Sequence, residues 1–243
     1  KSKSRRRKSY QKRSAAWSRK YKDSIDCKHP KGFSQRAHCA SKKKSKFQSD
    51  SNEFCKIKVK LSVNTIKELK LLCEQKDKNG KQNEKAGNMK AIKNSSGIYI
   101  IEINQDSMIK GGEVGVDIVP GLYNFHSHPK NAYTIYDVKL GWPSAQDYIG
   151  FLMASVEDDT IFHIVATLEG VYIISIHKDW LSNKKFNNTI GDYIAKKYNF
   201  SYQDGDTVKS YLDKVNNIEY KGSKLFVVQF LPCEKSNNMF TIT

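Results

Sequence analysis

The sequence contains few cysteines and no long apolar segment. Its five cysteines, among 243 residues, are scattered and odd in number, which argues against a disulfide framework and agrees with a reducing compartment: Cys27, Cys39, Cys55, Cys73 and Cys233. No apolar run approaches the roughly 20 residues that span a bilayer, and the first residues lack the apolar core of a secretory signal. We therefore expect a soluble intracellular protein without a membrane span.

Acidic residues are almost absent from the first 46 positions. Residues 1–46 carry 18 of the 42 Lys and Arg residues but only two acids, Asp23 and Asp26. The formal net charge of +17 therefore belongs mainly to this segment, and the remainder, with 24 basic and 23 acidic residues, is nearly neutral. The composition predicts a mostly disordered basic tail over residues 1–50 that binds DNA or an acidic partner.

Four potential metal ligands lie within this tail, and two interpretations of them remain open. Cys27, His29, His38 and Cys39 fall within 13 residues, as in a small zinc site. His38 and Cys39 are adjacent, however, which makes them awkward partners on one ion. We favour a solvated tail that becomes ordered on a polyanion.

From residue 51 onward the pattern of apolar residues is that of a folded domain, which we place at residues 51–243. Alternating apolar and polar residues predict strands, and apolar residues three and four apart predict helices. The predicted strands are residues 54–62, 84–92, 97–103, 121–128, 160–168, 170–177 and 224–232. The predicted helices are residues 62–75, 143–156, 189–200 and 206–215. This order predicts an α/β (α+β) domain with helices packed on a mixed, largely antiparallel sheet.

Two histidines lie one residue apart at the end of a predicted strand. Because successive strand residues face opposite sides, His126 and His128 project from the same face and can bind one ion. Pro129 cannot continue a central strand, so we expect the pair at a strand end, where loops build sites. His-x-His also occurs by chance on exposed strands, so the pair alone is weak evidence for a metal.

Ser144 and Asp147 begin the predicted helix that follows. A Ser at the N-cap with an acid three residues later is close to a capping box, and it can also present a hydroxyl and a carboxylate to a pocket. His126, His128 and Asp147 supply the three protein ligands that a catalytic zinc requires beside an open position. A carboxylate base is then needed. The upstream candidates are Glu84, Glu102 and Glu113.

Taken together, these positions resemble the JAMM (MPN+) zinc metalloproteases. That family has a Glu on the strand after the first helix, often in Glu-x-x-Gly, then His-Ser/Thr-His-Pro and Ser-x-x-Asp. The matching residues, within residues 54–232, are Glu84 with Gly87, His126-Ser127-His128-Pro129, and Ser144 with Asp147. The resemblance implies the family's fold, a mixed sheet of the cytidine-deaminase-like kind flanked by helices.

The resemblance also implies a chemistry. His126, His128 and Asp147 would bind Zn²⁺. Glu84 would be the general base and acid, and Ser144 would donate a hydrogen bond to the oxyanion. Family members mostly hydrolyse isopeptide bonds of ubiquitin or ubiquitin-like conjugates by attack of zinc-activated water. In them, a segment before the His-x-His strand pairs with the extended ubiquitin tail, and residues 104–122 occupy that place here.

One departure from the family is the length of the segment between Pro129 and Ser144. Its 14 residues form a longer spacer than the usual one, although a longer loop costs little closure entropy. Tyr133, Tyr136 and Trp142 within it could reshape or cover the cleft, and Trp142 fits an ordinary core position equally well. The substrate therefore stays open at this point.

The basic tail resembles a second, short module that occurs in proteins of large DNA viruses. The resemblance lies in Cys-x-x-Pro-Lys-Gly-Phe-Ser-Gln followed by His-Cys, at residues 27–39. It implies a viral protein of the host cytoplasm or nucleus that is also packaged in the virion. The alternative to an enzyme is accordingly a virion-associated structural or scaffold protein with a JAMM-like body and a nucleic-acid-binding tail.

Overall fold

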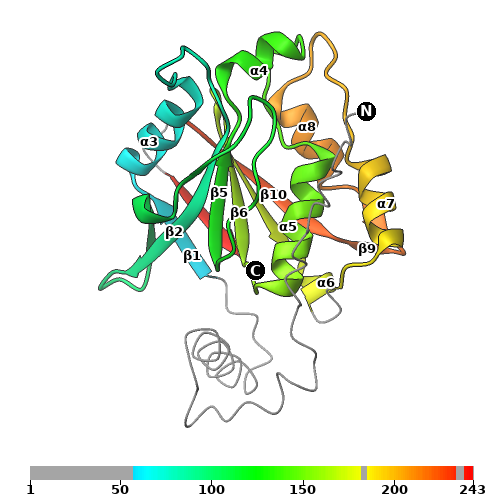
Figure 1. Cartoon of the computed structure of the whole chain (residues 1–243). Helices are drawn as coiled ribbons and strands as arrows, with labels where there is room; N and C mark the ends of the chain where they lie inside the picture. Colours follow the sequence, from blue (N-terminus) through cyan, green and yellow to red (C-terminus); the bar gives the residue numbers. More distant parts are fainter. Residues whose placement is uncertain (1–56, 182–184, 234–237, 243) are drawn as a thin grey trace, which may run out of the picture. The chain divides into compact units, whose positions relative to one another are not determined.

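A nine-stranded sheet forms the centre of the computed structural model, which describes residues 57–181, 185–233 and 238–242 (Figure 1). These residues all belong to one unit, residues 55–243. The predicted basic tail lies outside the described residues, and so do its four potential metal ligands Cys27, His29, His38 and Cys39.

The sheet has the order β10-β7-β6-β5-β2-β3-β1-β11, and β4 pairs with β2 beside this path. Among the strand pairs of the described residues, only β1–β3 and β5–β6 are parallel, which confirms the predicted mixed, mostly antiparallel sheet. The strands are β1 (Ile57–Leu61), β2 (Lys85–Lys93), β3 (Tyr99–Ile103), β4 (Ile109–Lys110), β5 (Tyr123–Ser127), β6 (Phe162–Ala166), β7 (Gly170–Ile176), β10 (Phe226–Pro232) and β11 (Met239–Ile242). A separate hairpin joins β8 (Glu219–Tyr220) to β9 (Ser223–Lys224).

Helices cover both faces of this sheet (Figure 1). They are α3 (Val63–Glu74), α4 (Lys130–Ile135), α5 (Ala145–Glu157), α6 (Lys178–Leu181), α7 (Asn188–Lys197) and α8 (Val208–Val215), with a 3₁₀ turn η1 at Gln105–Ser107. The residues of β6 alternate between two cores, as the period of a strand requires. Ile164 packs with the α3 core, whereas Val165 packs with the core under α5, α7 and α8.

Several short elements are absent from the sequence prediction. The segment expected to be a plain spacer, residues 130–143, begins with α4, and the segment expected to be a loop, residues 104–121, contains η1 and β4. A further strand, β11, follows the predicted last strand and pairs antiparallel with β1. Elements this short are stabilised by tertiary pairing rather than by their own propensity, so local patterns do not reveal them.

Within the described part of the chain, we find no helix with both the length and the apolar character needed to cross a membrane.

Candidate metal centre

The end of β5 presents both histidines of the His-x-His motif. β5 lies between β2 and β6, and His126 pairs with Ala86 on one side and with Val165 on the other. The backbone N–H of His128 donates to the carbonyl of Ala166 at 2.9 Å, which continues the pairing one residue past the strand. Both rings therefore project from the same face of the sheet, as the two-residue period predicts.

The third member of the cluster comes from the start of α5. Ser144 is the N-cap of this helix, and its backbone N–H donates to Oδ2 of Asp147 at 2.6 Å. This capping bond satisfies one of the free N–H groups at the helix start and holds the carboxylate toward the sheet. Asp147 therefore caps the helix and also lies beside the two histidines.

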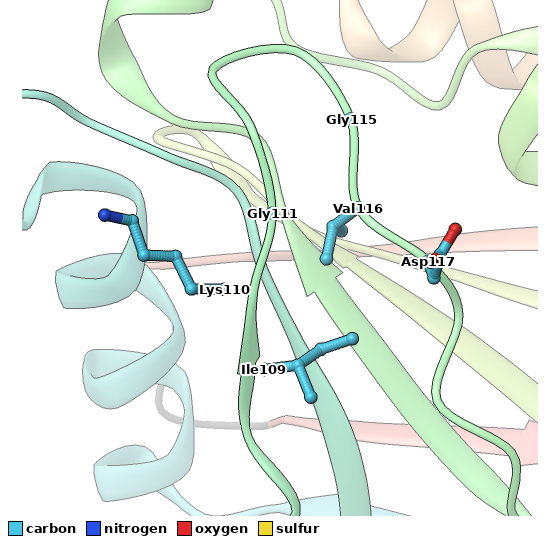
Figure 2. Close-up of a pocket in the computed structure, with 6 residues that line it drawn as sticks. All are labelled: Ile109, Lys110, Gly111, Gly115, Val116 and Asp117. Carbon is cyan, nitrogen blue, oxygen red and sulfur yellow. The ribbon is translucent and has the colours of Figure 1, made fainter. Parts of the chain in front are cut away.

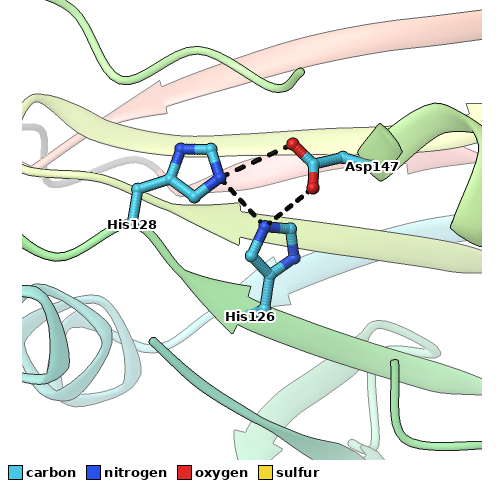
Figure 3. Close-up of side chains that lie close together, drawn as sticks. All are labelled: His126, His128 and Asp147. Carbon is cyan, nitrogen blue, oxygen red and sulfur yellow. Dashed lines mark hydrogen bonds and ion pairs between the residues drawn. The ribbon is translucent and has the colours of Figure 1, made fainter. Parts of the chain in front are cut away.

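Figure 3 shows how the three side chains converge. The Nε2 atoms of His126 and His128 lie 3.0 Å apart. Asp147 places Oδ1 3.2 Å from Nε2 of His126 and Oδ2 3.5 Å from Nε2 of His128. All three ligand atoms lie within 4.8 Å of one another, so this triad could hold a metal ion.

The electrostatics of the triad favour an ionised carboxylate. Burial opposes the charge, but the two histidines hold the pKa of Asp147 well below its ordinary value. Burial likewise opposes a charge on His128, yet the hydrogen bond and charge of Asp147 raise the pKa of His128 to about 9. The metal-free triad is thus a compact ion-pair cluster.

Glu84 faces the same side of the sheet as the triad. Ala86 pairs with His126, so the antiparallel register brings Glu84 opposite His128 and onto the same face. Only 7% of Glu84 is exposed, and burial raises the pKa of its carboxyl, which also lies within electrostatic range of the triad. The backbone around Glu84 is anchored on both sides: its N–H donates to Gly112 and its carbonyl accepts from Gly111.

The other two candidate bases lie elsewhere. Glu102 is exposed on β3 and pairs with Lys90, and Glu113 is partly exposed and forms an ion pair with Lys81 at 3.3 Å. The glycine of the Glu-x-x-Gly match, Gly87, packs closely, because a Cβ there would come within 3.0 Å of the Phe125 ring.

A buried histidine that the sequence analysis missed lies behind His126. Nε2 of His163, on β6, lies 2.6 Å from Nδ1 of His126, and Nδ1 of His163 lies 2.6 Å from Oδ1 of Asn124. Burial holds the pKa of His163 well below its ordinary value. The sequence signal for His163 was its place as a single histidine in a mostly apolar predicted strand. In the folded sheet it lies on the face shared with His126.

The segment 130–143 supports the other histidine. Nδ1 of His128 lies 2.8 Å from the carbonyl oxygen of Gly141, and the N–H of Gly141 donates to Glu169 at 2.8 Å. Glu169 also accepts from the hydroxyls of Tyr133, at 2.6 Å, and Tyr172, at 3.2 Å. These contacts tie the long spacer to the turn between β6 and β7.

Two aromatic residues of the spacer have different environments. Trp142 stacks on Tyr211 of α8 with ring centroids 4.9 Å apart and packs against the core, so the interpretation as a core residue holds. Tyr136 is 59% exposed at the end of α4. The helical portion around α8 therefore braces the segment that leads into Ser144, since Tyr211 also donates to the carbonyl of Pro143.

Beside β4, the segment 104–122 forms an open pocket, or hollow, of about 410 Å³ (Figure 2). Its lining comes from this one segment: Ile109, Lys110, Gly111, Gly115, Val116 and Asp117. A tight turn shapes it, because the N–H of Gly112 donates to Gly115 and a Cβ on Gly111 would come within 2.3 Å of the Gly115 oxygen. Among the described strands, β4 pairs only with β2, so no strand occupies its other edge.

No protein-family model and no curated protein matches the chain. The assignment of chemistry to this site rests on the residues themselves.

Proposed function

We propose that this chain is a JAMM-type zinc metalloprotease that hydrolyses isopeptide bonds of ubiquitin or ubiquitin-like conjugates. The observation that carries the proposal is the convergence of His126, His128 and Asp147, from the end of β5 and the start of α5, with Glu84 on the same face. Residues far apart in the sequence thus supply a ligand set and a buried carboxylate together.

The donor atoms fit zinc in type, and they lie close enough together to share one ion. Two imidazole nitrogens and one carboxylate oxygen are common zinc ligands, at bond lengths near 2.0–2.1 Å. Tetrahedral angles at such lengths separate neighbouring donors by about 3.3 Å. The two histidine nitrogens lie 3.0 Å apart, and each is close to a different oxygen of Asp147: Oδ1 lies 3.2 Å from His126 and Oδ2 lies 3.5 Å from His128. Three protein ligands also leave a fourth position open, as in catalytic rather than structural zinc sites.

Glu84 is the residue suited to move protons in this site. Bound zinc would supply a Lewis acid and lower the pKa of a bound water to about 7. The Glu84 carboxylate, with its pKa raised by burial, would take a proton and deliver it to the leaving lysine amine. Burial keeps bulk water away from this carboxylate and so strengthens its interactions with the reacting groups.

Ser144 would stabilise charge on the substrate. It lies at the exposed N-cap of α5, three residues before the ligand Asp147. A hydroxyl there would donate to the oxyanion that forms at the scissile carbonyl. The capping bond uses the backbone N–H of Ser144, so this role leaves the helix cap intact.

The edge of β4 that no described strand occupies is suited to an extended peptide. Strand addition supplies backbone hydrogen bonds, and the neighbouring hollow offers room for a side chain. An isopeptide substrate presents an extended C-terminal segment of this kind. We therefore place the substrate tail along residues 104–122.

Residues 1–46 carry the second part of the proposal. With 18 basic residues and two acids, they would hold the enzyme to DNA or an acidic partner in the host cell or in the virion of a large DNA virus. Binding to DNA should weaken steeply as salt rises. An affinity that is insensitive to salt would exclude phosphate contacts as its source.

The test compares zinc content and cleavage in three full-length proteins. We expect about one zinc per wild-type chain, loss of zinc in His126→Ala/His128→Ala, and retained zinc in Glu84→Gln. Wild type should cleave linked diubiquitin, and Glu84→Gln should be slower by about 10²–10⁴-fold. Zinc without cleavage of any conjugate would overturn the enzyme in favour of the scaffold, and a wild-type chain without zinc would overturn the metal site.

A further inference from the structure

A chain of buried polar groups leads away from the candidate ligand His126. Nδ1 of His126 contacts Nε2 of His163 at 2.6 Å, and Nδ1 of His163 contacts Oδ1 of Asn124 at 2.6 Å. Nδ2 of Asn124 then donates to the carbonyl of Val119 at 3.1 Å. The groups come from β5, β6 and the segment before β5, so the fold itself assembles the chain.

The direction of every hydrogen bond in this chain follows from its far end. The carbonyl of Val119 can only accept, so the amide of Asn124 turns its NH₂ group toward Val119 and its oxygen toward His163. An amide oxygen can also only accept, so Nδ1 of His163 carries the hydrogen. In a neutral ring, Nε2 of His163 is then an acceptor, and Nδ1 of His126 must be the donor.

The packing favours a neutral His163. The ring has no exposed surface, stacks on His126 with centroids 4.8 Å apart, and faces Phe151 at 6.3 Å. Within the described residues, its nitrogens contact only His126 and Asn124, and neither contact is a carboxylate. A cation buried in this way is strongly disfavoured.

We propose that His163 and Asn124 are positioning residues that hold His126 in the tautomer with hydrogen on Nδ1. With this hydrogen fixed on Nδ1, Nε2 is the nitrogen left to bind a metal, and it faces Asp147 and His128, where the metal would lie. The inference rests on the proposed metal site and adds to it the residues that prepare it. His128 is oriented by a single contact, because its Nδ1 faces the carbonyl oxygen of Gly141.

A prepared ring matters because metal binding then requires no ring rotation and no transfer of the hydrogen from Nδ1. Partners of the second ring nitrogen also raise the basicity of a ligating histidine, and their loss typically lowers metal affinity 10–100-fold. His163 would act only through His126.

The first experiment measures zinc affinity by competition with a chromophoric chelator. His163→Phe keeps a ring but removes the acceptor, and His163→Gln keeps an acceptor at the end of a side chain. We expect His163→Phe to bind zinc about 10–100-fold more weakly than wild type and His163→Gln to recover most of that loss. Equal affinity of His163→Phe and wild type would overturn the inference while leaving the metal site standing.

The second experiment needs no buried substitution, so it decides the question even if His163→Phe does not fold. The ¹⁵N shifts of the six histidines in the metal-free wild-type chain report which ring nitrogen carries hydrogen. We expect His126 to carry it on Nδ1. A hydrogen on Nε2 with a bare Nδ1 would overturn the proposal. Failure of the wild type to bind zinc at all would instead count against the proposed function.

Discussion

Glu169 accepts a hydrogen bond from the backbone N–H of Gly141 at 2.8 Å. The same peptide segment offers the Gly141 carbonyl to the candidate ligand His128, so Gly141 links the turn after β6 to the candidate metal centre. The long spacer of residues 130–143 is therefore anchored beside the site.

Glu169→Gln should loosen this anchor. The carboxylate accepts from Gly141, Tyr133 and Tyr172, and an amide offers one acceptor fewer and introduces a donor. We expect the free energy of unfolding to fall by about 1–3 kcal/mol, measured by urea denaturation. Hydrogen exchange should rise in residues 130–141. Glu68→Gln, at an exposed position of α3, is the control and should change neither quantity.

Asp147→Asn and Asp147→Ala should separate the two roles of this side chain. Both remove the proposed anionic ligand, so both should weaken zinc binding about tenfold or more in a chelator competition. An asparagine oxygen can still accept from the N–H of Ser144, whereas alanine loses that cap. Asp147→Ala should therefore unfold about 1 kcal/mol more easily than Asp147→Asn without metal. Equal stabilities would show that the cap contributes nothing.

Glu84→Gln should stabilise the metal-free protein while it removes activity. The pKa of Glu84 is raised by burial, so the ionised carboxylate opposes folding at neutral pH. This loss of stability is full above the folded-state pKa of Glu84. It disappears as pH falls below the ordinary pKa of a Glu carboxyl. Urea midpoints should favour Glu84→Gln at pH 7 and converge with wild type near pH 4. A variant that is less stable at pH 7 would contradict a destabilising charge.

The contribution of Asp77 to the free energy of unfolding should change with pH in the opposite direction to that of Glu84. A hydrogen bond from Lys110 of β4, with help from the N–H groups of Lys81 and Asn79, lowers the pKa of Asp77 to about 2. Because this pKa is depressed, ionised Asp77 stabilises the fold at pH values above the ordinary pKa of the carboxyl. This stabilisation is lost as pH falls toward 2. The difference in unfolding free energy between wild type and Asp77→Asn should shrink from pH 6 to pH 3. A constant difference would show that the charge of Asp77 is irrelevant.

Local pattern was sufficient for the main elements of the fold. The strands around β2, β3, β5, β6, β7 and β10 and the helices around α3, α5, α7 and α8 follow from apolar spacing and caps, with ends displaced by a few residues. The face shared by His126 and His128 also follows from the two-residue period of a strand. Ser144 and Asp147 were visible as a helix start for the same local reason.

Tertiary structure alone decided what surrounds these residues. His163 lies 37 positions from His126, and Glu169 lies 28 positions from Gly141, so neither contact leaves a local pattern in the sequence. The order β6-β5-β2 and its register bring His163 behind His126 and Glu84 opposite His128. Register is set by the packing of whole faces against helices, which sums many weak long-range contacts. The chain by itself thus determined which residues could bind a metal, and only the folded sheet decided which groups orient them.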